Sequence, residues 1–166
     1  MITITFPDGN TREFEAGVTA MAVAKSISSG LAKKVLAAKV NGELRDALRE
    51  IEGDAAIELI TAKDPEGLEL IRHDAAHVLA EAVQELFPGT QVTIGPVIEN
   101  GFYYDFYRDE PFSEDDFAKI EKKMAFIINR NDKFERIVMP RDEAIKTFED
   151  MGESYKAELI LSLIHI

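Results

Sequence analysis

Hydrophobic positions between residues 68 and 87 recur every three or four residues, the spacing that places them on one helical face. This pattern predicts a helix over residues 68–87, ended by Pro88 and Gly89. The apolar face comprises Leu68, Ile71, Ala75, Val78, Leu79, Ala82 and Leu86. His73 and His77 lie four residues apart, so they share a face, and that face is nearly opposite. The histidine face also contains Ala76, Ala80 and Gln84.

The first 62 residues alternate between strand patterns and turn residues. Strands are predicted at residues 1–6, 11–15, 35–40, 43–46 and 57–61. A helix is predicted from a Thr19 cap to about Ile27, with Gly30 as its end. Asn41 and Gly42 are typical of a two-residue hairpin turn. The order and spacing favour a ubiquitin-like β-grasp over residues 1–62, and its lack of histidine and of a phosphate-binding loop favours a docking module without chemistry.

A second domain is predicted at residues 68–160, after a linker at residues 63–67. Strands are predicted at residues 91–98, with a bulge at Gly95-Pro96, and at residues 102–106, joined by a turn at Asn100-Gly101. Phe102, Tyr104 and Phe106 then share one face of a strand, which is most typical of core packing, although a tyrosine hydroxyl can also orient a ligand.

The remaining pattern adds helices and one strand. Ser113 is predicted to start a helix that ends near Arg130, and residues 134–139 are predicted to form a strand. Pro140 opens a helix that runs through Met151 and is ended by Gly152, and residues 153–156 follow as a loop. Mixed helices and hairpins of this kind indicate an α+β fold.

Composition narrows the class of protein. The chain has 166 residues and a net charge of −12. It contains no cysteine, and this absence excludes disulfides and thiolate metal sites. It contains no apolar run long enough for a membrane span and no signal-peptide pattern, which predicts a cytoplasmic protein without a membrane partner. Residues 1–63 carry 8 basic and 9 acidic residues, whereas residues 64–166 carry 11 basic and 22 acidic residues. The negative electrostatic field of the second part opposes autonomous nucleic-acid binding.

Three interpretations of the histidine pair remain open at this point. The two imidazoles can be solvated, can be core groups hydrogen-bonded under a second layer, or can carry chemistry. A histidine pair at this spacing is a weak signal by itself, because many helices have one. Histidine titrates near neutral pH, so either ring is suited to positioning water or exchanging a proton.

Three longer segments carry a resemblance. They are RHDAAHVLAEAVQELFP at residues 72–88, TIGPVIENGFYYDF at residues 93–106 and YKAELI at residues 155–160. With the β-grasp before them, the chain resembles the N-terminal part of bacterial threonyl-tRNA synthetases over residues 1–160. The resemblance implies a TGS module at residues 1–62 and a partial editing domain at residues 68–160, which hydrolyses serine wrongly esterified to the 3′ end of tRNA(Thr).

The resemblance also implies roles for individual residues. His73, His77 and Lys156 match family positions in the hydrolytic pocket and are the expected catalytic residues. Tyr104 and Gly95 match positions that contact the aminoacyl adenosine. Serine lacks one methyl group of threonine, which gives a synthetic pocket only about 1–3 kcal/mol of discrimination, so a second hydrolytic site is the usual remedy.

The chain also departs from the family pattern. An Asp-x-Cys-x-Gly-Pro-His segment completes the family's pocket, and this sequence lacks it. Two histidines are fewer than the three or four ligands of a stable zinc site, so no tightly held metal is expected. ATP, Mg and Zn are expected only for a catalytic core outside this chain. A full-length relative is expected to be a homodimer through its further domains.

The apolar tail at residues 161–166, LSLIHI, departs from the resemblance and fits a truncated or frame-shifted gene product. Uncovered apolar surface predicts weak self-association, which light scattering at rising concentration would detect. Two other functions stay open beside the ligase fragment. One is a free-standing hydrolase that edits in trans, and the other is a pure binding module.

Overall fold

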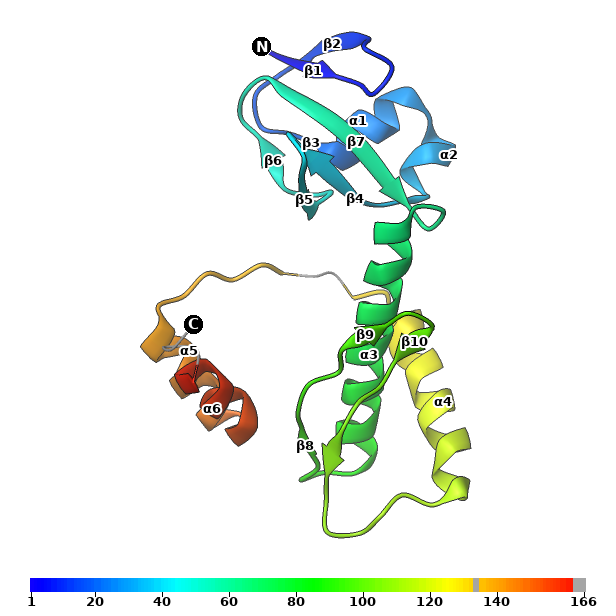
Figure 1. Ribbon diagram of the computed structural model, residues 1–166, viewed down its shortest axis with the longest axis vertical. Helices are drawn as coiled ribbons and strands as arrows, with labels where there is room; N and C mark the ends of the chain where they lie inside the picture. The colour runs from blue at the N-terminus through cyan, green and yellow to red at the C-terminus, as the bar shows by residue number, and fades with distance from the viewer. Residues whose placement is uncertain (133–134, 163–166) are drawn as a thin grey trace. The chain divides into compact units, whose positions relative to one another are not determined.

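The computed structural model describes residues 1–132 and 135–162 (Figure 1). Contacts divide it into two compact units, Met1–Ile71 and Arg72–Ile166, and the boundary falls inside helix α3. The first unit contains β1 (Ile2–Thr5), β2 (Thr11–Phe14), β3 (Val18–Thr19), α1 (Ala20–Ile27), α2 (Ser29–Ala32), β4 (Val35–Val40), β5 (Glu43–Asp46), β6 (Glu50–Ile51) and β7 (Ala55–Thr61). Helix α3 (Pro65–Leu86) follows. The predicted α+β class is confirmed.

The first unit is a mixed five-stranded sheet with a helix on one face. Its strand order is β2-β1-β7-β4-β5, in which β1 and β7 run parallel and the other neighbours are antiparallel. Ile2 and Ile4 alternate with threonines along β1 and turn into the core. There they join Val23 and Ala24 of α1, so the apolar face of one helix closes the sheet. This arrangement agrees with the predicted β-grasp.

Local sequence signals explain several boundaries in this unit. Asn41 and Gly42 both adopt positive φ, at 52° and 83°, as the two-residue hairpin turn between β4 and β5 requires. The prediction that Gly30 ends α1 is wrong. The helix ends at Ile27 with Ser28 as its C-cap, and Gly30 lies inside the short helix α2. The predicted linker at residues 63–67 is also too long, since α3 already begins at Pro65.

Thr19 gives a direct test of helix capping in this unit. Its side-chain oxygen accepts a hydrogen bond of 3.1 Å from the backbone N–H of Ala22. Thr19→Ala is expected to lower the free energy of unfolding by about 1 kcal/mol, measured by urea denaturation. Ser29→Ala, at a helix position whose side chain makes no hydrogen bond to the described residues, should change it by less than about 0.5 kcal/mol. Equal effects of the two changes would contradict the capping role.

The second unit combines helices with short strand pairs. After the rest of α3 come β8 (Gln91–Val92), β9 (Val97–Ile98), β10 (Gly101–Phe102), β11 (Phe106–Tyr107), α4 (Glu114–Arg130), α5 (Arg141–Asp150) and α6 (Ser154–Ser162). Ala82 and Val83 of α3 pack with Ile120 and Ile127 of α4 to form its core. Ser113 starts α4 with the predicted capping box, in which Asp116 is the partner.

The predicted strands of this unit are wrong in detail. The strand at residues 91–98 is interrupted after Val92, and the return strand at residues 102–106 is likewise split into β10 and β11. Ile98 pairs with Gly101, so the hairpin turn consists of Glu99 and Asn100 rather than Asn100 and Gly101. Short ladders remain at either end, and the chain between them bends around the cavity described below.

Two further predictions fail near the end of the described chain. Residues 135–139 form no strand, and Phe134 of that predicted strand lies outside the described residues. Residues 154–156 belong to helix α6 and not to a loop. Of the apolar tail, residues 163–166 also lie outside the described part. No helix in the described ranges combines the length and hydrophobicity that a bilayer crossing needs.

Candidate functional site

The two histidines of α3 contact each other directly. Their Nε2 atoms lie 3.0 Å apart, and the ring centroids lie 4.6 Å apart with the planes at 75°. A hydrogen bond between two Nε2 atoms needs one ring to donate a proton and the other to accept it. The pair therefore shares one proton along this contact in its neutral form. The helix makes the contact possible, because side chains four residues apart are neighbours on its surface.

His77 is shifted toward its neutral form. Partial burial lowers the pKa of its imidazole, and the positive charges of His73 and Lys156 lower it further. The negative charge of Asp74 opposes this shift, but its effect is smaller than that of burial or of His73. A lowered pKa keeps His77 uncharged at neutral pH, where it can accept a proton. The same shift makes His77 contribute stability that is fully present above its unfolded pKa of about 6.5 and is lost as the pH falls toward its folded pKa.

This shift predicts a measurable titration. In NMR spectra of the folded chain, the ring protons of His77 should titrate with a midpoint below the ordinary value of about 6.5. The midpoint should rise in His73→Ala, because one positive neighbour is removed. Lys146→Ala, on α5, should leave it unchanged. A midpoint at or above the ordinary value in the unmodified chain would contradict the electrostatic argument.

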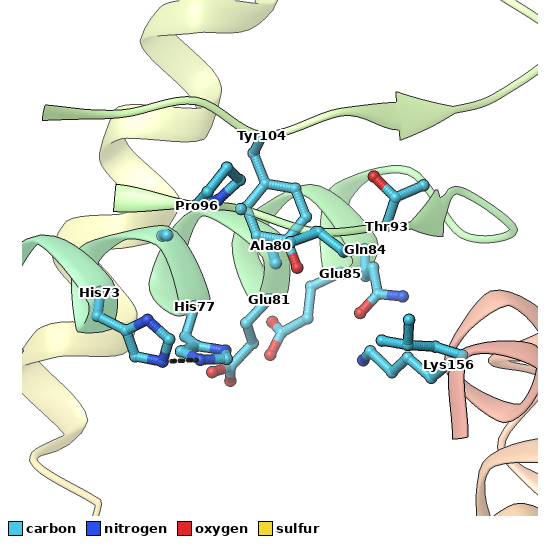
Figure 2. A pocket seen from close by; sticks show the side chains of 14 residues that line it. His73, His77, Ala80, Glu81, Gln84, Glu85, Thr93, Pro96, Tyr104 and Lys156 are labelled. Carbon is cyan, nitrogen blue, oxygen red and sulfur yellow. Dashed lines mark hydrogen bonds between the residues drawn. The ribbon is translucent and has the colours of Figure 1, made fainter. Parts of the chain in front are cut away.

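The histidine pair lies at the edge of an open cavity of about 730 Å³ (Figure 2). Figure 2 shows the histidines and Lys156 toward opposite sides of it, with Gln84 between them. The lining residues are His73, Ala76, His77, Ala80, Glu81, Gln84, Glu85, Thr93, Ile94, Gly95, Pro96, Tyr104, Lys156 and Leu159. All five residues selected from the sequence therefore line one cavity, although their roles stay predictions.

Gly95 and Tyr104 form one wall of the cavity. A Cβ atom built on Gly95 would lie 2.2 Å from Cδ2 of Tyr104, so the ring occupies the space that any other residue would need. The Tyr104 ring also stacks on Phe106 at 4.9 Å between centroids. Burial and the negative charge of Glu153 raise the pKa of the Tyr104 hydroxyl. That hydroxyl consequently stays protonated at neutral pH and can donate a hydrogen bond into the cavity.

Lys156 reaches the cavity from the first turn of α6. Its Nζ lies 3.5 Å from Oε2 of Glu153 and 5.9 Å from the centroid of the Phe148 ring. Glu153 is buried, and its Oε1 accepts a 2.5 Å hydrogen bond from Nε2 of Gln84. The lysine is thus tied to α3 through one carboxylate and one amide.

The acidic residues of the cavity wall are paired with cations of α4. Arg130 forms ion pairs with Glu81 and Glu85, and Lys123 forms a further pair with Glu85. The hydrogen bond from Lys123 lowers the pKa of the Glu85 carboxyl, so that carboxylate stays charged and engaged. These pairs reduce the negative charge that the two glutamates present to a substrate.

Sequence reasoning did not identify Gln84 and Glu153 as parts of the site. Gln84 lies on the histidine face predicted from the sequence, and its position on that face is the signal that could have identified it. Glu153 carried no such signal, because its contact with Gln84 joins residues that are 69 positions apart in the sequence. In the described ranges no group of three or more metal-binding side chains occurs, and the expectation of no tightly held metal stays a prediction.

Comparison with known proteins shows which proteins this chain is similar to. Residues 2–61 match the TGS domain family. A threonine–tRNA ligase of Hyphomonas neptunium is 60% identical over 164 residues, which is 99% of this chain and 25% of that protein. Those of Chelativorans and Thiobacillus denitrificans are 61% and 57% identical, over 95% and 99% of this chain. The chain is homologous to threonine–tRNA ligases.

The TGS match covers only part of the region that the threonine–tRNA ligases match. The TGS match ends at residue 61, before α3 begins, so it does not include the histidine pair or the cavity. The threonine–tRNA ligases match both units, at about 60% identity. The chain spans about a quarter of the length of these relatives. The cavity therefore lies in the part of the chain that follows the TGS match and is still similar to threonine–tRNA ligases.

Proposed function

We propose that residues 72–162 provide the proofreading pocket of a threonine–tRNA ligase, which hydrolyses the ester of serine on tRNA(Thr). The observation that carries this proposal is that a hydrogen-bonded histidine pair and a lysine line the same cavity. Its volume lies within the range of small-ligand sites and suits the terminal adenosine with its amino acid. About 60% identity to threonine–tRNA ligases supports tRNA(Thr) as the nucleic acid of this proposal.

The reaction is the addition of water to an ester. An oxygen of water attacks the carbonyl carbon of the seryl ester while its proton passes to a neutral imidazole of the pair. The Lys156 ammonium stabilises the negative charge that develops on the carbonyl oxygen. Collapse of the tetrahedral intermediate breaks the bond to the ribose oxygen, which takes the proton back from the imidazole. The products are serine and tRNA with a free terminal hydroxyl.

The walls of the cavity are suited to hold the adenosine. The Tyr104 ring is packed over Gly95, so the wall is flat on one side and carries a donor hydroxyl. Ala76 and Ala80 are buried along the floor and leave room for a ligand between the histidines and the tyrosine. A mostly apolar lining that includes an aromatic ring and a few placed polar groups is typical of a small-ligand site.

The body of the tRNA must be held mainly by other parts of the longer protein. The net charge of this chain is −12, and 22 of its 31 acidic residues follow residue 63, so its field repels a phosphate backbone. We therefore assign to this chain only the 3′ end of a serine-mischarged tRNA(Thr), presented in the cytoplasm. Aminoacylation is assigned to the rest of the ligase.

The test is selective deacylation by the chain itself. Ser-tRNA(Thr) and Thr-tRNA(Thr) are incubated separately with the purified chain, and the remaining ester is followed over time against a buffer blank. The proposal predicts faster loss of serine than of threonine. Equal loss of both esters, or no loss above the blank from a chain shown to be folded by circular dichroism, would contradict activity in this part of the ligase.

A further inference from the structure

A carboxylate outside the cavity lining, that of Glu153, is buried and only partly hydrogen-bonded. Glu153 is 8% exposed, and in the described part of the chain its Oε2 has no hydrogen-bond partner. Burying a charged group without full hydrogen bonding is costly. The Nζ of Lys156 lies 3.5 Å from that oxygen and forms an ion pair with it, without the geometry of a hydrogen bond.

The other oxygen of the same carboxylate is firmly held. Gln84 donates its amide Nε2–H to Oε1 at 2.5 Å and reaches the backbone oxygen of Thr90 at 3.4 Å. The backbone of Glu153 is fixed as well, because its N–H donates to Phe148 and its carbonyl accepts from Lys156 and Ala157. The carboxylate is therefore clamped from α3 on one side and from the start of α6 on the other.

This geometry leaves one oxygen free to act on the lysine. Lys156 has a long flexible side chain, and holding its ammonium at one point in a cavity costs conformational entropy. A fixed anion 3.5 Å away restricts that motion and selects the rotamers that keep Nζ beside the cavity.

We propose that Glu153, held by Gln84, is a positioning residue that fixes the Lys156 ammonium for the hydrolytic step. The proposal rests on the function assigned above, and it adds a buried carboxylate and the amide that holds it to the residues of the site. In this proposal Gln84 connects α3, which carries the two histidines, to the carboxylate beside Lys156 of α6. The histidines and the lysine are thereby held in fixed relative positions. A purely structural role, as a polar contact between helices, is the competing interpretation.

A labelling experiment tests the positioning without needing activity. The chain is treated with a trace of an acetylating reagent, and the modification of each lysine is measured by mass spectrometry. Glu153→Gln keeps an oxygen for Gln84 but loses the charge, so acetylation of Lys156 relative to Lys146 should change by about 3-fold or more. Glu158→Gln, an exposed carboxylate on the same helix, should not change it. Unchanged labelling in a folded Glu153→Gln variant would overturn the proposal.

A double-mutant cycle then separates positioning from structural support. In deacylation of Ser-tRNA(Thr), Glu153→Gln is expected to lower kcat by about 10-fold with KM changed less than 2-fold. The same change in a Lys156→Ala background should have no further effect, because Glu153 acts only through the lysine. A further 10-fold loss in that background would overturn the proposal in favour of a structural role.

A second variant covers the case in which Glu153→Gln folds poorly. Gln84→Ala leaves the carboxylate in place but removes its side-chain donor, and it should alter Lys156 labelling in the same direction. The two experiments also separate this proposal from the assigned function. A labelling change without any Ser-tRNA(Thr) hydrolysis supports the positioning and refutes the hydrolysis, whereas hydrolysis with unchanged labelling refutes the positioning alone.

Discussion

Replacing His73 with alanine is expected to slow the release of serine from Ser-tRNA(Thr) by about 100-fold or more. The physical reason is the 3.0 Å contact between the Nε2 atoms of His73 and His77. Without the first ring, the second loses the partner that fixes its tautomer and accepts or returns a proton. The rate is measured under single-turnover conditions, with the enzyme in excess over the mischarged tRNA, so that it reports the chemical step.

The two histidines should behave as one unit in this assay. His77→Ala is expected to cost about as much as His73→Ala, and the double variant should be little worse than either single one. Glu121→Ala, at an exposed position of α4 outside the cavity, should keep the original rate and shows the effect of an unrelated truncation. A His73→Ala variant that retains a rate within a few-fold of the original would refute the catalytic assignment.

The pH dependence of the same rate gives an independent check on this mechanism. An imidazole accepts a proton only when it is neutral, and the pKa of His77 is lowered by burial and by two positive neighbours. The rate should therefore be constant at neutral pH and fall on acidification, with a midpoint below the ordinary histidine value of about 6.5. In Lys156→Ala the midpoint should move upward, although the rate itself falls, because one positive charge near His77 is gone.

Features that depend on local chemistry were predictable from the sequence. The Thr19 cap, the positive-φ turn at Asn41 and Gly42 and the capping box at Ser113 all use groups within a few residues of one another. The histidine pair belongs to this class, because helical geometry alone brings residues four apart together. The face they occupy was also predicted, and its small residues Ala76 and Ala80 do line the cavity.

Features that depend on distant contacts were not predictable in the same way. The predicted strand at residues 91–98 breaks where the ring of Tyr104 occupies the space beside Gly95, a contact between two separate stretches of chain. Glu153 is identified as part of the site only by its contact with Gln84, which lies 69 residues earlier. A single sequence carries no periodicity that reports such a pair. The positions of Lys156 and Tyr104 were instead inferred through the resemblance.

Replacing Gly95 with alanine is the second large expected effect, since the added methyl group cannot fit. Its Cβ would lie 2.2 Å from Cδ2, 2.4 Å from Cε2 and 3.1 Å from Cγ of Tyr104, so the ring must leave its place. Overpacking of this kind costs about 1–3 kcal/mol of folding free energy. The displaced ring also enters the cavity, so deacylation should fall by about 100-fold, because misplacing groups in a site by an ångström already costs that much.

Gly53→Ala supplies the matched control for this change. No atom lies within 4 Å of a Cβ built there, and its φ is not positive, so only the backbone-entropy effect of replacing glycine remains. That effect stabilises a folded chain by about 0.4–1 kcal/mol where the conformation is compatible. Urea denaturation should therefore show Gly53→Ala neutral or slightly stabilised and Gly95→Ala destabilised. Equal stability of the two variants would mean that the Tyr104 ring is not packed against Gly95.

A double variant identifies the clash as the cause. Tyr104→Ala removes the ring that Gly95→Ala collides with, so adding Gly95→Ala to it should cost almost nothing further in stability. The two single changes are therefore expected to be strongly non-additive, with a coupling free energy of about 1–3 kcal/mol. Additive losses would show that Gly95 is required for a reason other than Tyr104, such as a strained backbone. Because φ at Gly95 is not positive, no such strain is expected, and the packing of the tyrosine ring is the remaining cause.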